Sequence, residues 1–451
     1  MPDLDLFTLT FDTHPAFGWT VPTAKTEPVL SAPEADADDT DEPPAPAPVT
    51  VPCGTNLYLD ADRKLARGWP ARARDNLAAI RLSKDLEASG RIPTPDEQSA
   101  MLRFIGFGAT ELAQNCFPLP GTSEFRNGWA DTGRALMDLV SPREYATLQR
   151  ATQYAHFTPE PIGRALWRAA QHLGFTGGRV LEPGMGTGLF FALLPPALRG
   201  ACRLTGIEYE PVTARIARLV FPEACVRCED YTRSPLGGGF DLAIGNPPFA
   251  DRVVRADPTT AALGLRLHDY FIARSISRLR PGGIALFVTS TGTMDKANTT
   301  ARTHIAGLAD LIGAVRLPEA SLRTTAGTDV VVDVLVFQRR QDGHPPGGAA
   351  WIDLTEIALE DGAAPEDGHA DIATDPVAPA SPDRRPGVVA VNAYFATHPE
   401  MVLGTHAQRH GIYGPGLSYT CRARPDAASL ETQLNAAGLN SLLVDVELPL
   451  T

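Results

Sequence analysis

The residues with the most specific chemistry in this chain are Asn246, Pro247, Pro248 and Phe249, which directly follow the apolar run Phe240–Gly245. Consecutive prolines hold φ at about −65° and remove backbone donors, so the segment presents acceptors, namely the Asn246 side-chain oxygen and the Pro247 carbonyl. Such acceptors suit a planar NH2 group, and the Phe249 ring can stack on a base. The alternative is a proline-rich turn after a buried strand, because short motifs also arise without function.

An acidic residue and a glycine-rich turn form a second candidate site upstream. The strand-like run that ends at Glu182 is followed by Pro183, Gly184, Gly186 and Gly188. A dinucleotide-binding fingerprint would place its third glycine at position 189, which is Leu189, so pyrophosphate binding is disfavoured. A carboxylate before the turn repels phosphate and can pair with a cationic ligand such as the ammonium group of an amino acid.

Acidic residues also end the next two strand-like runs. Glu208 lies at the sequence distance at which a ribose-binding acid is expected after such a turn. Tyr209 beside it can lie on an adenine face or pack at the strand end. Asp230 can accept a hydrogen bond from an adenine amino group or can be a solvated loop residue, and Tyr231 beside it is also expected to contact the cofactor.

These candidate residues require strands and helices in a particular order. Strand-like runs, each followed by an acidic or amide residue, succeed one another between residues 179 and 249, with helix-like segments between the first ones. This order is typical of an α/β protein. Farther along, residues 269–279 have the apolar spacing of a helix, and residues 284–288 read as another strand.

Together these motifs resemble the class I S-adenosylmethionine-dependent methyltransferases, and Asn-Pro-Pro-Phe resembles the branch that modifies adenine N6 in DNA. The resemblance implies a Rossmann-like sheet with helices on both faces and an antiparallel last strand, formed by the runs 314–318 and 330–337. It also implies roles in that family's terms. Residues 182–188 would wrap the methionine moiety of the cofactor, Glu208 would hold its ribose, and residues 246–249 would hold a flipped base, with Asn246 also near the cofactor.

The segment His156-Phe157-Thr158-Pro159 resembles the element that these enzymes place ahead of the glycine turn to cover the carboxylate of the cofactor. The resemblance therefore adds Phe157, Thr158 and Pro159 to the expected cofactor contacts. The same residues also read as a helix N-cap followed by prolines, and both interpretations can hold together. No chemistry is assigned to His156.

The charge of the chain is concentrated in two segments. The chain has 451 residues and a formal net charge of −13. Residues 1–50 hold ten acidic residues and one lysine, and residues 351–385 hold nine acidic residues and two arginines. Both segments are rich in Pro and Ala and are expected to be disordered. The remaining residues carry a small positive charge, so the acidity does not exclude DNA binding.

Cysteine usage and hydropathy indicate a soluble, cytoplasmic protein. Only Cys225 and Cys228 are closely spaced, and without a second pair or a His cluster they predict core thiols and no metal site. The first residues lack the basic start of a signal peptide, and no apolar run is long enough for a membrane span.

The pattern predicts five parts along the chain. These are a disordered acidic segment at 1–55, a helical N-terminal domain at 56–150, the catalytic domain at 151–340, an acidic linker at 341–388 and a small segment at 389–451.

Basic residues indicate where DNA would be contacted. One group accompanies Trp69 and consists of Arg63, Lys64, Arg67, Arg72, Arg74, Arg81 and Lys84. A phosphate-tracking surface and a solvated helix explain that group equally well. A second group, Arg252, Arg255 and Arg266, follows Phe249 and would border the base pocket.

Residues 73–82, 94–108 and 391–404 resemble segments of large bacterial methylase-helicase proteins carried on mobile elements. This resemblance favours DNA as the acceptor. Because the chain has no Walker loop, either the helicase has been lost or it is a separate polypeptide, and a separate helicase or another defence or plasmid subunit is the expected partner.

The sequence therefore predicts methyl transfer from S-adenosylmethionine to the N6 amino group of adenine in DNA. Two alternatives stay open. One is methylation of another planar NH2, in guanine N2 of RNA or a glutamine amide of protein, and the other is a non-catalytic DNA-binding subunit.

Overall fold

The computed structural model describes residues 54–359, 387–410 and 417–436, which belong to one compact unit. Nearly all of the predicted acidic segment 1–55 and the greater part of the acidic run 351–385 lie outside the described residues. Within the described part, no helix is both long and apolar enough to span a membrane.

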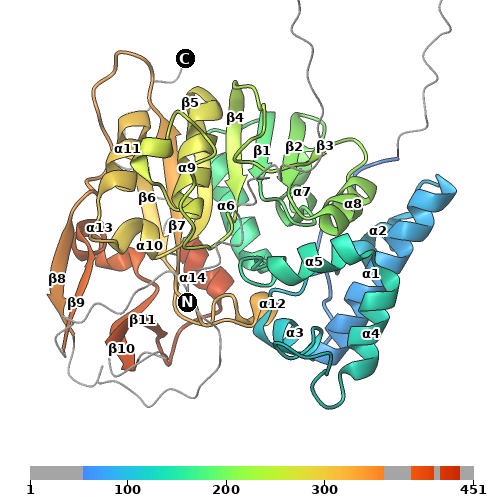
Figure 1. The fold of residues 1–451 in the computed structure, drawn as a ribbon. Helices are drawn as coiled ribbons and strands as arrows, with labels where there is room; N and C mark the ends of the chain where they lie inside the picture. The colour runs from blue at the N-terminus through green and yellow to red at the C-terminus, as the bar shows by residue number, and fades with distance from the viewer. Residues whose placement is uncertain (1–53, 360–386, 411–416, 437–451) are drawn as a thin grey trace, which may run out of the picture. The chain divides into compact units, whose positions relative to one another are not determined.

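A seven-stranded sheet forms the centre of the described residues (Figure 1). Its strands are β1 (Gly178–Pro183), β2 (Cys202–Glu208), β3 (Cys225–Cys228), β4 (Phe240–Gly245), β5 (Leu279–Ser290), β6 (Ala309–Arg316) and β7 (Val332–Arg339). Their order is β3-β2-β1-β4-β5-β7-β6, with β7 antiparallel to both of its neighbours and the other pairs parallel. The Rossmann-like sheet with an antiparallel last strand is therefore confirmed.

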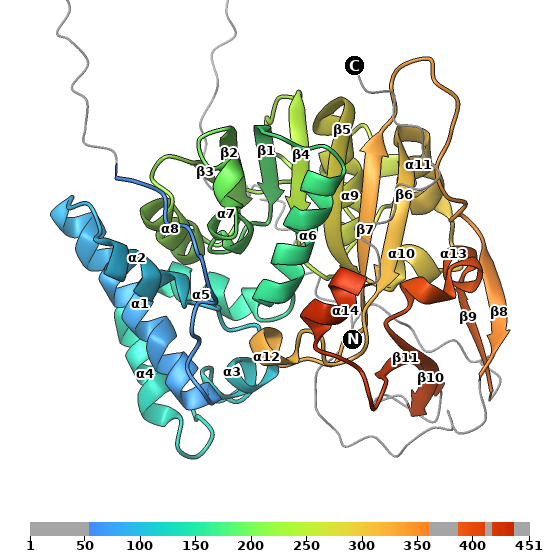
Figure 2. The same ribbon diagram turned by 180° about the vertical axis from the view of Figure 1, so that it is seen from behind.

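Helices cover both faces of this sheet, as expected. Helices α9 (Leu267–Arg278) and α11 (Thr300–Leu308) lie on one face, and α6 (Glu160–His172) lies on the other, with α14 (Leu430–Ala436) against it (Figures 1 and 2). Because both faces are covered, the central strands read as nearly continuous apolar runs. In β4, for example, every side chain except Asp241 is buried.

The order of the strands locates the functional edge of the sheet. Strand β1 lies between β2 and β4, so the chain moves outward in one direction through β2 and β3 and then in the other through β4 and β5. Ligands of such sheets bind beyond the carboxyl ends of the strands, at the point where the order reverses. The ends of β1 and β4 meet at this point, and they carry the glycine turn and the Asn-Pro-Pro-Phe loop.

The region before the sheet is helical, as predicted. Its helices are α1 (Trp69–Ser89), α2 (Pro95–Leu102), α3 (Thr110–Asn115), α4 (Ala130–Leu139) and α5 (Pro142–Ala151). Thr94 and Ser141 begin α2 and α5 with reciprocal capping boxes. Helices α1, α2 and α5 pack against α8 (Pro211–Val220), which itself packs against β2 and β3. The N-terminal helices therefore share a core with the sheet.

The C-terminal segments lie at the edge of the sheet that is formed by β6. They contain β8 (Leu354–Ala358), β9 (Val388–Asn392), α13 (Ala393–Thr397), β10 (Gly404–His410) and β11 (Leu417–Ala423). Strand β8 lies inside the run expected to be disordered, and it is ordered by antiparallel pairing with β9. That part of the prediction is wrong, because strand pairing with a distant segment is not visible in local composition.

A buried arginine joins these segments to the sheet. Arg316, in β6, forms two hydrogen bonds of 2.8 Å to Asp333 in β7, and its Nη1 lies 2.8 Å from Asp295 in α10 (Gly292–Asp295). The ring of Phe395 packs 4.2 Å from the guanidinium. Asp295 in turn accepts from the backbone N–H of Asn392 at 2.9 Å.

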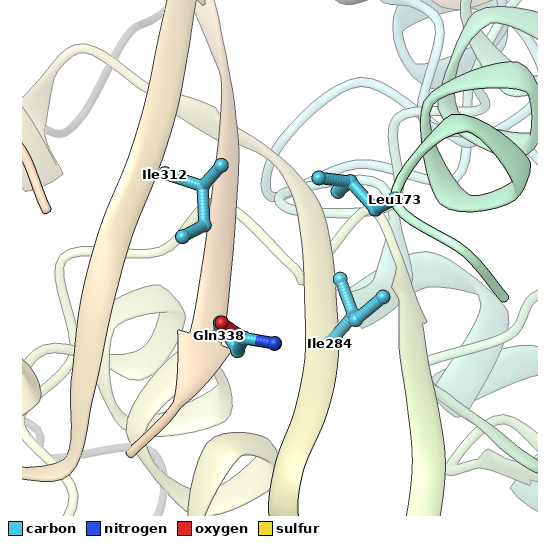
Figure 3. A pocket seen from close by; sticks show the side chains of 4 residues that line it. All are labelled: Leu173, Ile284, Ile312 and Gln338. Carbon is cyan, nitrogen blue, oxygen red and sulfur yellow. The ribbon is translucent and has the colours of Figure 1, made fainter. Parts of the chain in front are cut away.

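A small hollow of about 180 Å³ lies at the opposite edge of the sheet from the glycine turn (Figure 3). It is lined by Leu173, Ile284, Ile312 and Gln338. Ile284 and Gln338 are paired at the beginning of β5, whereas the functional edge lies at its other end. The apolar lining and this position give the hollow no part in the chemistry considered below.

Candidate active site

The glycine turn after β1 has a backbone that only glycine accommodates. Gly186 and Gly188 have φ values of 56° and 84°. A Cβ at Gly188 would lie 2.5 Å from Cε2 of Phe221, which is fully buried. The turn leads directly into α7 (Leu189–Ala192). Its glycines are therefore required by backbone geometry and by close packing.

Glu182 ends β1 with a buried and incompletely bonded carboxyl group. The residue is 2% exposed, and its Oε2 has no hydrogen-bond partner among the described residues. Burial raises the pKa of Glu182 well above its usual range, and the nearby Glu208 raises it further. The backbone N–H groups of Phe190 and Phe191 act in the opposite direction. A carboxyl group in this position gains strongly from a cationic ligand.

Glu208 ends β2 and holds the glycine turn. Its Oε2 accepts from the backbone N–H of Gly186 at 2.8 Å, and its Oε1 accepts from the N–H of Glu210 at 2.8 Å. Burial raises the pKa of Glu208 to about 7, although the N–H group of Glu210 lowers it. The carboxylate retains lone pairs beyond these two bonds, so it can accept from a ligand hydroxyl.

The two residues that follow β2 and β3 differ in what they offer. The Tyr209 side chain is 47% exposed at the strand end, which leaves its ring open to a ligand. Asp230 accepts from both the N–H and the hydroxyl of Thr232 at 2.8 Å through Oδ1 alone. Its other oxygen accepts no hydrogen bond from the residues that the structure describes, so one acceptor is left for a ligand.

Tyr231 has a different place from the one predicted. It is 2% exposed, its hydroxyl lies 2.9 Å from the Ser275 hydroxyl, and its ring packs 4.7 Å from that of Phe271. The side chain belongs to the core between β3 and α9. Only the main chain of Tyr231 remains for contact with a cofactor, which corrects the expectation for its ring and hydroxyl.

Asn246 is the first residue after β4, and its amide is oriented by one strong contact. Its Nδ2 donates to the His156 carbonyl oxygen at 2.8 Å, while Oδ1 is buried without a partner in the described part of the chain. Since a carbonyl can only accept, this contact determines which end of the amide faces the site. The acceptor oxygen is therefore the free end, as the sequence predicts for an NH2-binding group.

The Asn-Pro-Pro-Phe loop lies directly against the glycine turn. A Cβ at Gly184 would lie 3.4 Å from Cδ of Pro248, and one at Gly245 would lie 3.6 Å from Pro183. Pro247 is buried, and Pro248 is half-buried. The structure thus brings together the two sites that are separated by about sixty residues in the sequence.

Phe249 is covered in this structure. It is 3% exposed, and its ring lies 5.8 Å from that of His156 at an interplanar angle of 48°. Burial lowers the pKa of His156 to about 4, so this imidazole is neutral at pH 7. In this conformation the Phe249 ring is not open to a base, because His156 lies beside it, and its stacking on a base stays a prediction.

The segment before α6 lies over the glycine turn. A Cβ at Gly186 would lie 3.3 Å from Cε1 of Phe157. Thr158 is buried, and Pro159 occupies the N-cap position of α6 without a side-chain cap bond. Thr158 is therefore not the helix cap, and its contact with a cofactor stays a prediction.

Similar proteins were found by sequence and by structure, although no family model matches the chain. The chain is 29% identical over 211 residues to Defense against restriction protein B of Escherichia phage P1, covering 46% of this chain and 9% of that protein. It is 25% identical over 199 residues to the Type II methyltransferase M.CvrRI of Paramecium bursaria Chlorella virus XZ-6E, covering 43% and 51%. The chain thus spans at most about half the length of these curated relatives.

The predicted resemblance to class I methyltransferases is confirmed. Two solved methyltransferase structures are also similar, with low sequence identity and low TM-scores. One is the methyltransferase subunit of a type I restriction-modification system from Streptococcus thermophilus, with 15% identity, 60% of this chain and 65% of that chain covered, and a TM-score of 0.38. The other is the N-methyltransferase NodS from Bradyrhizobium japonicum, with 18% identity, 44% and 96% covered, and a TM-score of 0.29.

The arginines predicted to touch DNA differ in their availability to a ligand. Arg255 is exposed, and Arg252 is half-buried. Arg266 donates to the Asp251 carbonyl at 2.7 Å and lies 3.1 Å from its carboxylate, so it closes the loop that follows Phe249. We therefore expect Arg266 to shape this loop, and Arg255 to be the better candidate for a DNA phosphate.

Several basic residues of the N-terminal group have internal partners. Arg63 is 4% exposed and pairs with Glu160, Arg72 donates to the Ala66 carbonyl, and Lys84 donates to the Leu139 carbonyl. These contacts favour a structural role for the three residues, whereas a phosphate-tracking surface needs free basic groups.

Sequence reasoning did not single out Asp269, Thr293 or Lys296, which lie near the loop that follows Phe249. Asp269 lies 3.3 Å from the Nε2 of His268 and 3.7 Å from Lys296, and it accepts from Thr293 at 2.9 Å. An acid beside a His at the start of α9 was the available signal. Across the described residues, no three His, Cys, Asp or Glu side chains converge as metal ligands.

Proposed function

We propose that this chain is an S-adenosylmethionine-dependent methyltransferase that modifies the N6 amino group of adenine in DNA. The observation that carries the proposal is the orientation of Asn246, whose Nδ2 is held by the His156 carbonyl and whose buried Oδ1 is left open. This acceptor stands at the end of β4, against the glycine turn. A preoriented acceptor at this place favours a substrate with an NH2 group.

S-adenosylmethionine is the cofactor that the resemblance implies, and the residues at the site fit it. Glu182 offers a buried carboxyl oxygen without a partner for the ammonium group, and Glu208 offers free lone pairs for the ribose hydroxyls. Tyr209 and Asp230 offer an exposed ring and an open carboxylate oxygen for the adenine. When bound, this cofactor supplies a methyl group on positively charged sulfur.

In the proposed reaction, the residues of this chain orient and polarise the acceptor amine. The Asn246 side-chain oxygen and the Pro247 carbonyl accept the two N6 hydrogens, which favours a more tetrahedral nitrogen with a free lone pair. The same acceptors stabilise the positive charge that develops on this nitrogen. No general base is required, because the proton can leave after transfer. Alignment of the amine with the methyl group accounts for much of the rate enhancement.

DNA is favoured as the acceptor by the viral relative, which is a Type II methyltransferase, and by the resemblance to mobile-element methylase-helicase proteins. The phage relative, a protein named for defence against restriction, fits the same setting. We propose that a separate helicase or another defence or plasmid subunit is a partner.

The test is incubation of the full chain with methyl-labelled S-adenosylmethionine and unmethylated DNA, RNA or protein, followed by mass spectrometry of the digested products. We expect label in N6-methyladenine from DNA, and none when Asn246 is replaced by Ala. Label in RNA or protein alone would reject the DNA assignment. A chain that binds the cofactor and labels none of the three would reject the proposed reaction.

A further inference from the structure

The segment 155–159, which we call the strap, is held by side chains from three separate parts of the chain. Successive strap carbonyls accept hydrogen bonds from Asn246 Nδ2 at 2.8 Å, from Thr325 Oγ1 at 2.5 Å and from Arg63 Nη2 at 3.2 Å. The accepting oxygens belong to His156, Phe157 and Thr158. Buried carbonyls bonded in this way have one preferred position, because each lost bond leaves a polar group unsatisfied.

The ring of Phe157 lies between two glycines from distant segments. A Cβ at Gly106 would lie 3.0 Å from Cε2 of this ring, and a Cβ at Gly186 would lie 3.3 Å from its Cε1. Phe104 adds an edge-to-face contact at 6.4 Å. The Phe157 ring is therefore packed between the N-terminal turn 104–108 and the glycine turn. Gly186 also donates to Glu208, so the ring packs against a residue that positions the second acid of the site.

Asn76, in α1, holds this N-terminal turn through two hydrogen bonds. It is fully buried, its Nδ2 donates to the Gly106 carbonyl at 2.5 Å, and its Oδ1 accepts from the Ile105 N–H at 3.0 Å. Both ends of the amide are thus used on one turn. A continuous set of contacts leads from Asn76 through the turn and the Phe157 ring to Gly186.

We propose that the N-terminal helical region forms a wall of the cofactor site, and that Asn76, Arg63 and Thr325 are positioning residues for cofactor binding. This inference rests on the proposed function. It assigns the region a task other than reading DNA. Two of its buried polar residues, Asn76 and Arg63, are directed at the turn and the strap, and neither is available to a DNA phosphate.

The experiment measures cofactor and DNA affinity separately in the full chain. S-adenosylhomocysteine is titrated calorimetrically, DNA affinity is followed by fluorescence anisotropy, and thermal melting checks the fold. Thr325→Val removes the hydroxyl that bonds the Phe157 carbonyl and nearly keeps the side-chain volume, whereas Thr325→Ser keeps the hydroxyl. We expect Thr325→Val to raise the Kd for S-adenosylhomocysteine roughly tenfold, and Thr325→Ser to restore it to within about threefold of the wild type.

Asn76→Ala tests the same wall from the other side, and Asn115→Ala is its matched control. Asn115 is also buried, but its Nδ2 bonds only to the Glu111 carbonyl of its own helix. We expect Asn76→Ala to raise the cofactor KM at least about tenfold, with kcat at saturating cofactor and DNA affinity near wild type. Asn115→Ala should leave all three unchanged.

The outcomes separate this inference from the proposed function. A wild-type chain that does not bind S-adenosylhomocysteine overturns the proposed function and the wall with it. A wild-type chain that binds, with Thr325→Val binding equally well, overturns the wall alone. Loss of DNA affinity at unchanged cofactor affinity in Asn76→Ala would likewise overturn it, in favour of a DNA-reading role.

Discussion

Glu208 lies close enough to Glu182 to raise the pKa of Glu182, yet the hydrogen bonds of the two carboxyl groups differ. Glu208 has one backbone N–H group on each oxygen, whereas Glu182 has an oxygen without a partner in the described ranges. Glu208 therefore titrates near neutral pH, and the pKa of Glu182 is raised further still. At the residue scale, the site is prepared for a ligand that brings positive charge and hydroxyl groups.

Cofactor affinity is predicted to increase with pH through this range. The pKa of Glu208 is about 7, so its carboxyl group is mostly protonated at lower pH. It must then lose a proton before it can accept hydrogen bonds from the two ribose hydroxyls. We expect the Kd for S-adenosylhomocysteine to be up to about tenfold higher at pH 6 than at pH 8. In Glu208→Gln the affinity should be weaker and the slope smaller, and an unchanged slope would contradict the assignment.

The same pKa shift has the opposite effect on the stability of the ligand-free chain. Since burial favours the neutral form of Glu208, its stabilising contribution is present below the ordinary pKa of a glutamate and is lost as pH rises through about 7. Thermal melting of the wild type and Glu208→Gln should therefore converge at low pH. At high pH, Glu208→Gln is expected to melt at the higher temperature.

Asn246 is predicted to serve turnover more than cofactor binding. Asn246→Ala removes the only side-chain acceptor of the Asn-Pro-Pro-Phe loop, so we expect kcat to fall by at least about a hundredfold. The Kd for S-adenosylhomocysteine should rise by no more than about tenfold, as expected for Thr325→Val, because Asn246→Ala also removes one hydrogen bond to the strap. Asn298→Ala, at an exposed asparagine, is the control. Loss of both properties, or of neither, would overturn the role given to Asn246.

At the element scale, β6, β7 and α10 meet at Arg316. This fully buried guanidinium neutralises Asp333 and Asp295, and it also packs against Phe395 from the C-terminal part of the chain. A buried ion pair is a weak source of net stability, but removal of one partner leaves uncompensated charge. Arg316 is therefore one of the residues that attach the C-terminal segments to the central sheet.

Arg316→Ala is predicted to destabilise the chain by about 3–5 kcal/mol, because the fully buried Asp333 would lose its charged partner and Asp295 would keep only its bond to the Asn392 N–H. Urea denaturation of the full chain measures this change. The control is Arg91→Ala, which removes an ion pair to Glu97 that is exposed on the surface. Its effect should be below about 1 kcal/mol. Equal effects of the two substitutions on the free energy of unfolding would show that the buried cluster contributes no more to stability than an exposed ion pair.

At the scale of the whole molecule, the acidic residues are concentrated in segments mostly outside the described residues, and basic residues lie near the site. The loop after Phe249 carries Arg255, which is exposed, and Arg266, which is paired with Asp251. When a protein binds DNA phosphates through such groups, the logarithm of its affinity falls linearly with the logarithm of the salt concentration. The slope is proportional to the number of phosphate contacts.

Arg255→Ala is predicted to weaken DNA binding and to reduce the slope of log Kd against log salt by about 0.9, which corresponds to one phosphate contact. The cofactor Kd should not change. Anisotropy titrations over a range of KCl concentrations measure the slope. Arg74→Ala, exposed on α1, is the comparison. A slope that changes only in Arg74→Ala would move the DNA contact to the N-terminal helices.

Sequence alone determined the local features of the site. Apolar runs punctuated by glycine and proline place Glu182, Glu208 and Asn246 at strand ends, because strand length and turn chemistry depend on neighbouring residues. The acceptor character of the Asn-Pro-Pro-Phe loop also follows from residue type. Together with the resemblance, these features were sufficient to predict the sheet and its antiparallel last strand.

The tertiary structure alone decided which groups are available at the site. The Asn246 amide is oriented by a carbonyl ninety residues away, Tyr231 and Phe249 are covered by distant side chains, and Arg63 is paired with Glu160. Spacing along the chain does not encode such partners, since burial and hydrogen bonding are set by segments that meet only in the folded state. For this reason the sequence indicated what the site can bind, and the fold decided which atoms are left to bind it.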